Sequence, residues 1–251
     1  MIGSVHFADV GLLTALGALR KTPNAGELPG LRQANLGVAS PLGAAKLPTG
    51  RFGLVALWDD DAALDRFLEG HPLARILSSG WRARLKPLRA YGSWPGLPTD
   101  TPTARATDSE GPVASLTLGR LRISQAARFL RVSARAEASA NEAEGLIWGT
   151  GLGAPPFVST FSLWRDTRSV TAYTYGRRDP AHSDAVRAEA AQPFHHQSAF
   201  IRFQPYAWEG ALAGKNPLAT DALTSPVSKL DLQASETNVQ SLHASARHQR
   251  A

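Results

Sequence analysis

The feature that most constrains this chain is a faint internal repeat, in which one half of the sequence can be laid over the other. The segment Phe52–Asp60 overlies Phe157–Asp166, and Phe67 then falls on Tyr173 at the same distance from its tryptophan. Further along, 81–89 overlies 194–202 without a gap. Matches that keep the same order along the chain indicate two similar units with the same local structure.

Breaks in composition divide the 251 residues into two bodies. The stretch 96–111 is rich in Pro, Thr and Asp, which is typical of a linker. The stretch 211–251 holds mostly Ala, Ser, Gln and Thr, and buries too little apolar surface to offset the entropy lost on ordering. We therefore expect an N-terminal half at 1–95, a linker at 96–111, a C-terminal half at 112–210 and a disordered tail at 211–251.

Each half has the pattern strand, helix, strand, strand, helix, strand, with the second helix split in two. In the C-terminal half we expect these elements at 113–121, 124–137, 145–153, 156–164, 166–175 with 179–191, and 198–204. This order is that of a ferredoxin-like unit, which carries its helices on one face of its sheet. The sequence therefore predicts an α+β fold of tandem duplicated ferredoxin-like units, whose sheets pack face to face as a barrel with a cavity between them.

Composition excludes several kinds of site. The chain has no cysteine, so disulfides, thiolate-bound haem and cysteine-held iron–sulfur or zinc centres are ruled out. The net charge is +6, but the basic residues are scattered and are not interleaved with aromatics, so we expect no nucleic-acid partner. No apolar run approaches the ~18 residues of a membrane helix. The start of the sequence has no signal-peptide pattern, and we expect a cytoplasmic protein.

With cysteine absent, histidines are the natural metal ligands. His182 follows Asp179 and Pro180 at an expected helix start, where the backbone N–H groups disfavour imidazolium and keep the ring available to a metal. A solvent-exposed histidine at a helix start is the alternative. His195 and His196 are adjacent in a strand and point to opposite faces, so one of them could face a cavity in its place.

Arg202 shares a strand face with Phe200, which leaves two interpretations open. If this face looks into the barrel, Arg202 is a cation in an apolar cavity, suited to pairing with a carboxylate such as a haem propionate. If the face looks outward, it is an ordinary surface arginine. No Walker, HExxH, GxSxG or paired-carboxylate motif is present to suggest other chemistry.

Four segments of the second half resemble the spheroidene monooxygenase family. The resemblance covers 112–210 well, 1–95 loosely and the tail not at all. The segments that carry it are Pro156–Trp164, Tyr173–Gly176, Pro180–Val186 and Pro193–Phe203.

This resemblance implies a haem-containing oxygenase of the dimeric α/β-barrel type, which introduces a keto group into acyclic carotenoids with dioxygen and reducing equivalents. It implies that His182 binds the haem iron and that Arg202 anchors a propionate. The aromatic residues expected to line the apolar pocket are Phe157, Phe161, Trp148 and Phe200.

The expected partners are an apolar small-molecule substrate, dioxygen and an electron donor, with contact to a membrane surface and homo-oligomer formation left open. Two other functions remain as alternatives. One is a cofactor-free α/β-barrel monooxygenase, and the other is a non-catalytic protein that binds haem or an apolar ligand.

Overall fold

The computed structural model describes residues 1–43, 50–104, 111–175 and 180–219. It confirms the α+β class, with eight strands and six α-helices among the described residues. Single 3₁₀ turns lie at Leu19–Lys21 and Ile123–Gln125. Along the chain the elements are β1 (Ile2–Asp9), α1 (Leu12–Ala18), β2 (Leu31–Pro41), β3 (Arg51–Trp58), α2 (Asp61–Gly70), α3 (Pro72–Leu77), β4 (Trp81–Gly92), β5 (Val113–Leu121), α4 (Ala126–Glu142), β6 (Leu146–Ala154), β7 (Phe157–Trp164), α5 (Thr167–Tyr175), α6 (Pro180–Ala191) and β8 (His195–Gly210).

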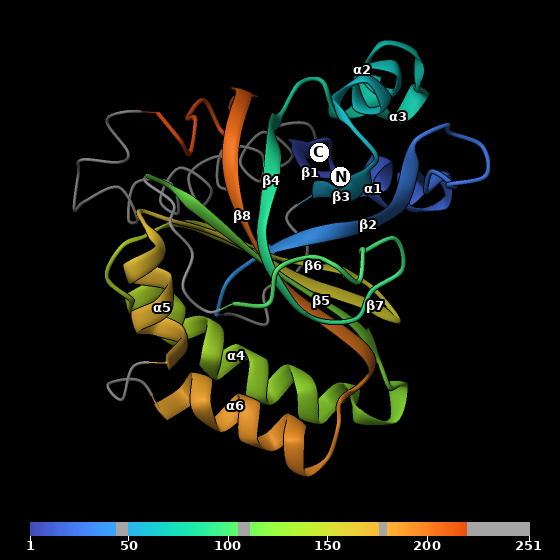
Figure 1. The fold of residues 1–251 in the computed structure, drawn as a ribbon. Coiled ribbons are helices and arrows are strands. Elements are labelled where there is room, and N and C mark those ends of the chain that lie inside the picture. Colours follow the sequence, from blue (N-terminus) through green and yellow to red (C-terminus); the bar gives the residue numbers. More distant parts are fainter. Residues whose placement is uncertain (44–49, 105–110, 176–179, 220–251) are drawn as a thin grey trace, which may run out of the picture.

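The strands close into an antiparallel barrel in the order β1-β3-β2-β6-β7-β5-β8-β4, with helices outside it (Figure 1). Within the first half the order of neighbours is β4-β1-β3-β2, and within the second it is β8-β5-β7-β6. The two halves are joined where β2 pairs with β6 and where β4 pairs with β8. Both halves therefore have the same element order and the same strand order.

Large apolar side chains fill the barrel interior, because alternate residues of every strand point inward. Phe7, Trp81, Trp148 and Phe161 form one aromatic group, with ring centroids 5.1 to 6.4 Å apart. All four are buried and belong to one hydrophobic cluster. Where the sequence predicts a cavity between the sheets, the structure has packed aromatic rings.

The two halves repeat one contact outside the barrel, at the end of the third strand of each half. Trp58 lies 5.2 Å from Phe67, and Trp164 lies 5.1 Å from Tyr173. Each indole N–H donates to a serine hydroxyl, at 2.8 Å in the first half and 2.9 Å in the second. The sequence repeat overlays the two tryptophans and their aromatic partners, whereas the two serines come from different strands of their halves, β1 and β7.

The segments expected to be unpacked at 96–111 and 211–251 are only partly described. Leu97 packs against the barrel cluster, and Leu212 and Leu218 are both buried in it. Asn216 also accepts a hydrogen bond of 3.0 Å from the Trp81 indole. Residues 211–219 thus pack against the barrel, since two leucines suffice to bury a short segment there. Residues 105–110 and 220–251 lie outside the described part of the chain.

Candidate functional site

The outer faces of the two half-sheets differ in chemistry. Outside the first half, apolar strand residues such as Phe52 and Leu54 are covered by buried side chains of α2 and α3. Outside the second half, the corresponding positions are small and polar, and they stay partly exposed to solvent. They are Ser115, Thr117, Thr160 and Ser198.

The helices over this second face pack on one another more than on the sheet. In α4 only Ala140 is buried, and α6 buries none of its described side chains. Arg128 joins the two helices by donating to the carbonyl oxygens of Ala188 at 2.9 Å and Gln192 at 2.8 Å. The helices therefore leave the small polar residues of this sheet face partly exposed.

Arg202 lies on this face, pointing out of the barrel, yet its side chain is only 6% exposed. Arg202 is therefore neither a cation inside the barrel nor an ordinary surface arginine, which were the two interpretations left open by the sequence, because it faces outward and is buried. Its direct partner on β4 is Arg89, which is 9% exposed. Burial lowers the pKa of Arg202, the charge of Arg89 lowers it further, and Tyr175 at the end of α5 opposes this shift. Two like charges therefore share a site shielded from water.

Neither arginine has a carboxylate partner among the residues that the structure describes. The Nη1 atom of each is buried without a hydrogen-bond partner there. A buried donor without an acceptor is costly, and a buried unpaired charge is more so. The arrangement is suited to an anion supplied by a ligand.

Phe200 stands beside Arg202 on the same face, as the sequence alternation predicts. It pairs with Tyr91 across β4 and with Thr117 across β5. Phe200 is 43% exposed and Tyr91 is 68% exposed. The two arginines are therefore bordered by an aromatic pair whose faces are free for contact.

The other three aromatic residues expected to line a pocket lie inside the barrel and not on this outer face. Phe157, Phe161 and Trp148 point into the barrel interior, where they belong to the central hydrophobic cluster. The structure thus brings Arg202 and Phe200 together and leaves these three on the opposite side of the sheet. The physical reason is the period-two alternation, which directs Ile201 and Phe203 inward with them and Arg202 outward.

The histidines are placed as follows. His182 is in α6, and its side chain lies outside the described part of the structure. His195 is half-buried over Gly119, with Nδ1 3.2 Å from Oε1 of Glu189. His196 is exposed. Among the described side chains, no three His, Asp or Glu residues cluster in a way that would hold a metal ion.

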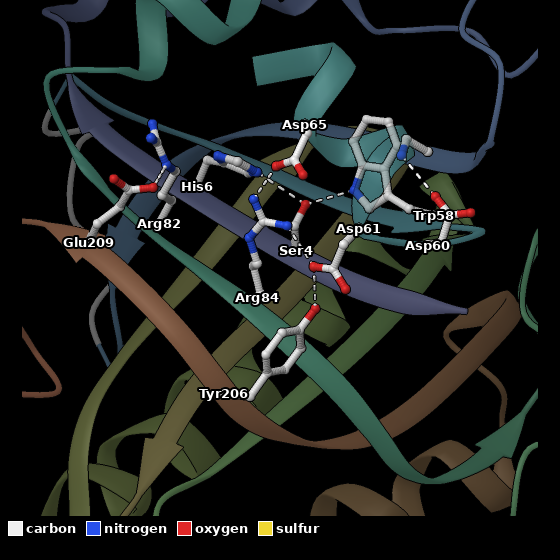
Figure 2. A network of polar contacts seen from close by, with 11 residues as sticks. Ser4, His6, Trp58, Asp60, Asp61, Asp65, Arg82, Arg84, Tyr206 and Glu209 are labelled. Atoms are coloured by element: carbon white, nitrogen blue, oxygen red, sulfur yellow. Dashed lines mark hydrogen bonds and ion pairs between the residues drawn. The ribbon is translucent and has the colours of Figure 1, made fainter. Parts of the chain in front are cut away.

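A polar network lies under α2 in the first half and includes His6 (Figure 2). Ser4 accepts from Trp58 at 2.8 Å and lies 3.0 Å from Nε2 of His6. Burial lowers the pKa of His6 to about 3, and the charges of Arg82 and Arg84 act in the same direction. His6 is therefore a neutral, hydrogen-bonded core residue.

The same network joins β4, α2 and β8 by charge. Arg84 donates to Asp61 at 2.5 Å and pairs with Asp65 as well. Tyr206 donates to Asp61 at 2.7 Å. Burial raises the pKa of Asp61, but the hydrogen bonds from Tyr206 and Arg84 outweigh it and lower the pKa on balance. In contrast to Arg89 and Arg202, the partly exposed Arg84 has counter-charges among the described residues.

Sequence reasoning missed Arg89, although a signal for it was present. The repeat that overlays 81–89 on 194–202 makes Arg89 the counterpart of Arg202. In the structure these counterparts face each other across the junction of the two halves.

Comparison with solved structures defines the fold. A crystal structure of aldoxime dehydratase (OxdRE) in complex with butyraldoxime matches 82% of this chain and 79% of its own, with a TM-score of 0.50 and 9% identity. At that identity the likeness concerns the fold alone. No protein-family model matches the chain.

Comparison with curated sequences defines the family. Spheroidene monooxygenase of Rubrivivax gelatinosus is 35% identical over 202 residues, which are 77% of this chain and 76% of that protein. Spheroidene monooxygenase of Cereibacter sphaeroides is 27% identical over 179 residues, 69% of this chain and 54% of that protein. The chain belongs to the spheroidene monooxygenase family. An alignment of 202 residues also extends beyond 112–210 into the first half, where the resemblance seen in the sequence was loose.

Proposed function

We propose that this protein is a monooxygenase, hence an oxidoreductase, that introduces a keto group into an acyclic carotenoid. The observation that carries the proposal is the 35% identity to a spheroidene monooxygenase across three quarters of both chains. The family name supports the reaction class and the carotenoid together.

The stoichiometry of this reaction requires the partners named above. Conversion of a methylene group to a ketone takes two monooxygenations at the same carbon. Each consumes one dioxygen and two electrons with two protons, leaves one oxygen atom in the substrate and releases the other as water. The second gives a geminal diol, which loses water to become the ketone. The enzyme therefore needs an electron donor besides dioxygen.

We further propose haem as the cofactor, seated on the outer face of the second half. When bound, haem would supply an iron centre with one coordination position for dioxygen. The described residues fit this group at its anionic edge, because Arg202 carries a buried Nη1 atom without a partner. Phe200 would contact the macrocycle, and His182 in α6 remains the proposed iron ligand. The buried setting of Arg202 would strengthen its hold on a propionate.

An absorption spectrum of the protein from haem-supplemented cells tests the cofactor. We expect a stoichiometric Soret band that shifts with dithionite and carbon monoxide. His182→Ala should reduce haem occupancy or change the spectrum, and an unchanged spectrum at full occupancy would refute that ligand. Exposed His196→Ala serves as the matched control.

Activity on a carotenoid separates the alternatives. Conversion by a colourless protein that refuses added hemin would identify a cofactor-free monooxygenase. Haem or carotenoid binding without turnover, in the presence of reductant and dioxygen, would identify a binding protein. Keto product formed only by the haem-loaded protein is the result that we expect.

We also propose that the barrel consists of two ferredoxin-like units that arose by duplication. The shared element order, the shared strand order and the repeated packing of a tryptophan on an aromatic residue support this origin. Aligned sequences of relatives would test it, since the two halves of a duplicated chain should resemble each other more clearly in some of them.

Contact with a membrane surface belongs to the same proposal, because the substrate is apolar. The described part of the chain contains no helix with the length and apolar character to span a bilayer. Helix α1, however, exposes three leucines and continues into the basic pair of Arg20 and Lys21, with no acidic residue in its first turn. The leucines are Leu12, Leu13 and Leu16.

Such a patch suits an anionic lipid surface. We expect the protein to sediment with phosphatidylglycerol vesicles and Leu13→Ser to reduce this binding. Equal binding of both proteins would contradict a role for α1.

A further inference from the structure

The feature that carries a further inference is the pairing of Arg89 with Arg202 at the junction of β4 and β8, which run side by side in Figure 1. Directly opposite residues of an antiparallel pair have Cβ atoms about 4.5–5.5 Å apart, where like charges destabilise the sheet. Both side chains are nevertheless buried, and among the residues that the structure describes neither Nη1 atom has a hydrogen-bond partner. The pair is costly for the chain alone, which indicates a ligand that compensates it.

A local irregularity of β4 creates this pairing. Along β4 the inward residues include Ala83 and Leu85, and regular alternation would continue inward at Pro87 and Arg89. The register between β4 and β8 shifts between Pro87 and Arg89, so that Leu88 is an extra residue. This bulge turns Arg89 to the outer face, beside Arg202, and returns Ala90 to the interior. Bulges that re-aim a side chain are common next to functional sites.

The surroundings restrict what the ligand can be. The next outward pair along the same two strands is Tyr91 with Phe200, whose rings are largely accessible. On the other side of Arg202, its partner on β5 is Ser115, a small residue that leaves room above the sheet. The ligand that fits is an anion attached to a flat apolar body.

We propose that Arg89 and Arg202 form one anion site, shared by the two halves of the chain, that binds the carboxylates of a porphyrin whose apolar body rests on Tyr91 and Phe200. The assignment to a porphyrin rests on the proposed haem cofactor, whereas the anion site rests on the arginine pair itself. Guanidinium groups suit carboxylates because their paired N–H donors match two oxygens.

Hemin titration of the haem-free full-length protein, followed by the Soret band, tests the site. We expect Arg89→Gln and Arg202→Gln each to weaken hemin binding by about tenfold or more, as expected for loss of charge-assisted hydrogen bonds. Arg120→Gln is the matched control, because Arg120 lies on β5 but is exposed. Circular dichroism and a thermal melt establish that each variant is folded.

Hemin dimethyl ester, which lacks the carboxylate charges, provides the second arm. The wild-type protein should bind the ester about as weakly as Arg89→Gln binds hemin, and the variants should no longer distinguish ester from acid. Hemin binding that is equally tight in wild type and both variants would overturn the role of the two arginines in porphyrin binding while leaving the haem proposal intact.

Inorganic phosphate provides the third arm and separates the two proposals. If the wild type binds no hemin, yet phosphate raises its melting temperature and does not raise that of Arg89→Gln or Arg202→Gln, the anion site stands and the porphyrin assignment fails with the proposed cofactor. If neither hemin nor phosphate distinguishes the variants from the wild type, the anion site itself is refuted.

Discussion

Replacing Arg202 with methionine should make the ligand-free protein more stable, although most changes of a buried residue do the opposite. Arg202 is buried opposite Arg89, and each carries a buried Nη1 atom that has no acceptor within the described ranges of the chain. Methionine replaces the apolar stem of arginine with an unbranched apolar side chain and removes both the charge and the unsatisfied donors. The sign of the stability change therefore reports whether the arginine has a partner within the protein.

The magnitude follows from two contributions. A buried donor left without an acceptor costs about 1–3 kcal/mol. Exchange of buried charged residues for apolar residues of similar volume has stabilised other proteins by about 1–4 kcal/mol. Since the apolar stem of Arg202 is conserved in methionine, we expect a gain of about 1–3 kcal/mol in the free energy of unfolding.

Urea denaturation of the haem-free protein measures this change for Arg202→Met, Arg89→Met and the double variant. Removing the second arginine should gain less than removing the first, because the repulsion between them is already gone. A fall of more than about 1 kcal/mol in Arg202→Met would refute the reasoning, since it would mean that the guanidinium has a stabilising partner in the ligand-free state.

Three further predictions concern other parts of the fold. The pKa of His6 is about 3 in the folded chain and 6.5 in the unfolded chain, so below pH 6.5 the unfolded chain binds a proton that the folded chain does not. Between pH 7 and pH 5 the free energy of unfolding should therefore fall by about 2 kcal/mol more in the wild type than in His6→Gln. Equal losses in urea denaturation of the two proteins would contradict this. In urea denaturation, Phe161→Ala should lower the free energy of unfolding by about 3–5 kcal/mol, whereas Phe200→Ala, at an exposed position, should lower it by under about 1 kcal/mol. Similar losses in the two variants would contradict the packed barrel interior. Asp60 caps the N-terminus of α2 by accepting a hydrogen bond of 2.9 Å from the Ala63 N–H. Asp60→Ala should therefore lower the free energy of unfolding by about 1 kcal/mol, measured by thermal melt. An unchanged stability would argue against this cap.

The sequence predicted the elements that depend on local pattern. The alternation in 157–164 placed Phe157 and Phe161 on one face, and the structure has both inside the barrel. The expected strand at 198–204 is longer in the structure, at His195–Gly210, because β8 pairs with β5 over 195–203 and with β4 over 199–210. Strand ends that depend on two partners are not visible in one strand's own pattern.

The site was less accessible to sequence reasoning, for identifiable reasons. Alternation could not decide which face of β8 looks inward, and the burial of Arg202 depends on elements distant in sequence, among them β4. Arg89 escaped notice because a single extra residue at Leu88 reverses the direction that alternation assigns to it. The aromatic pocket was expected inside the barrel, whereas the interior is packed and the accessible face lies outside it.

The most direct test of the proposed function is an incubation of haem-loaded and haem-free protein with spheroidene, a reductant and ¹⁸O₂, followed by mass spectrometry of the extracted carotenoid. A monooxygenase takes the keto oxygen from dioxygen. We predict that the haem-loaded protein forms a ketone carrying ¹⁸O and that the haem-free protein forms none. A keto product without the label would contradict oxygen insertion, and equal labelled product from both preparations would contradict the role of haem.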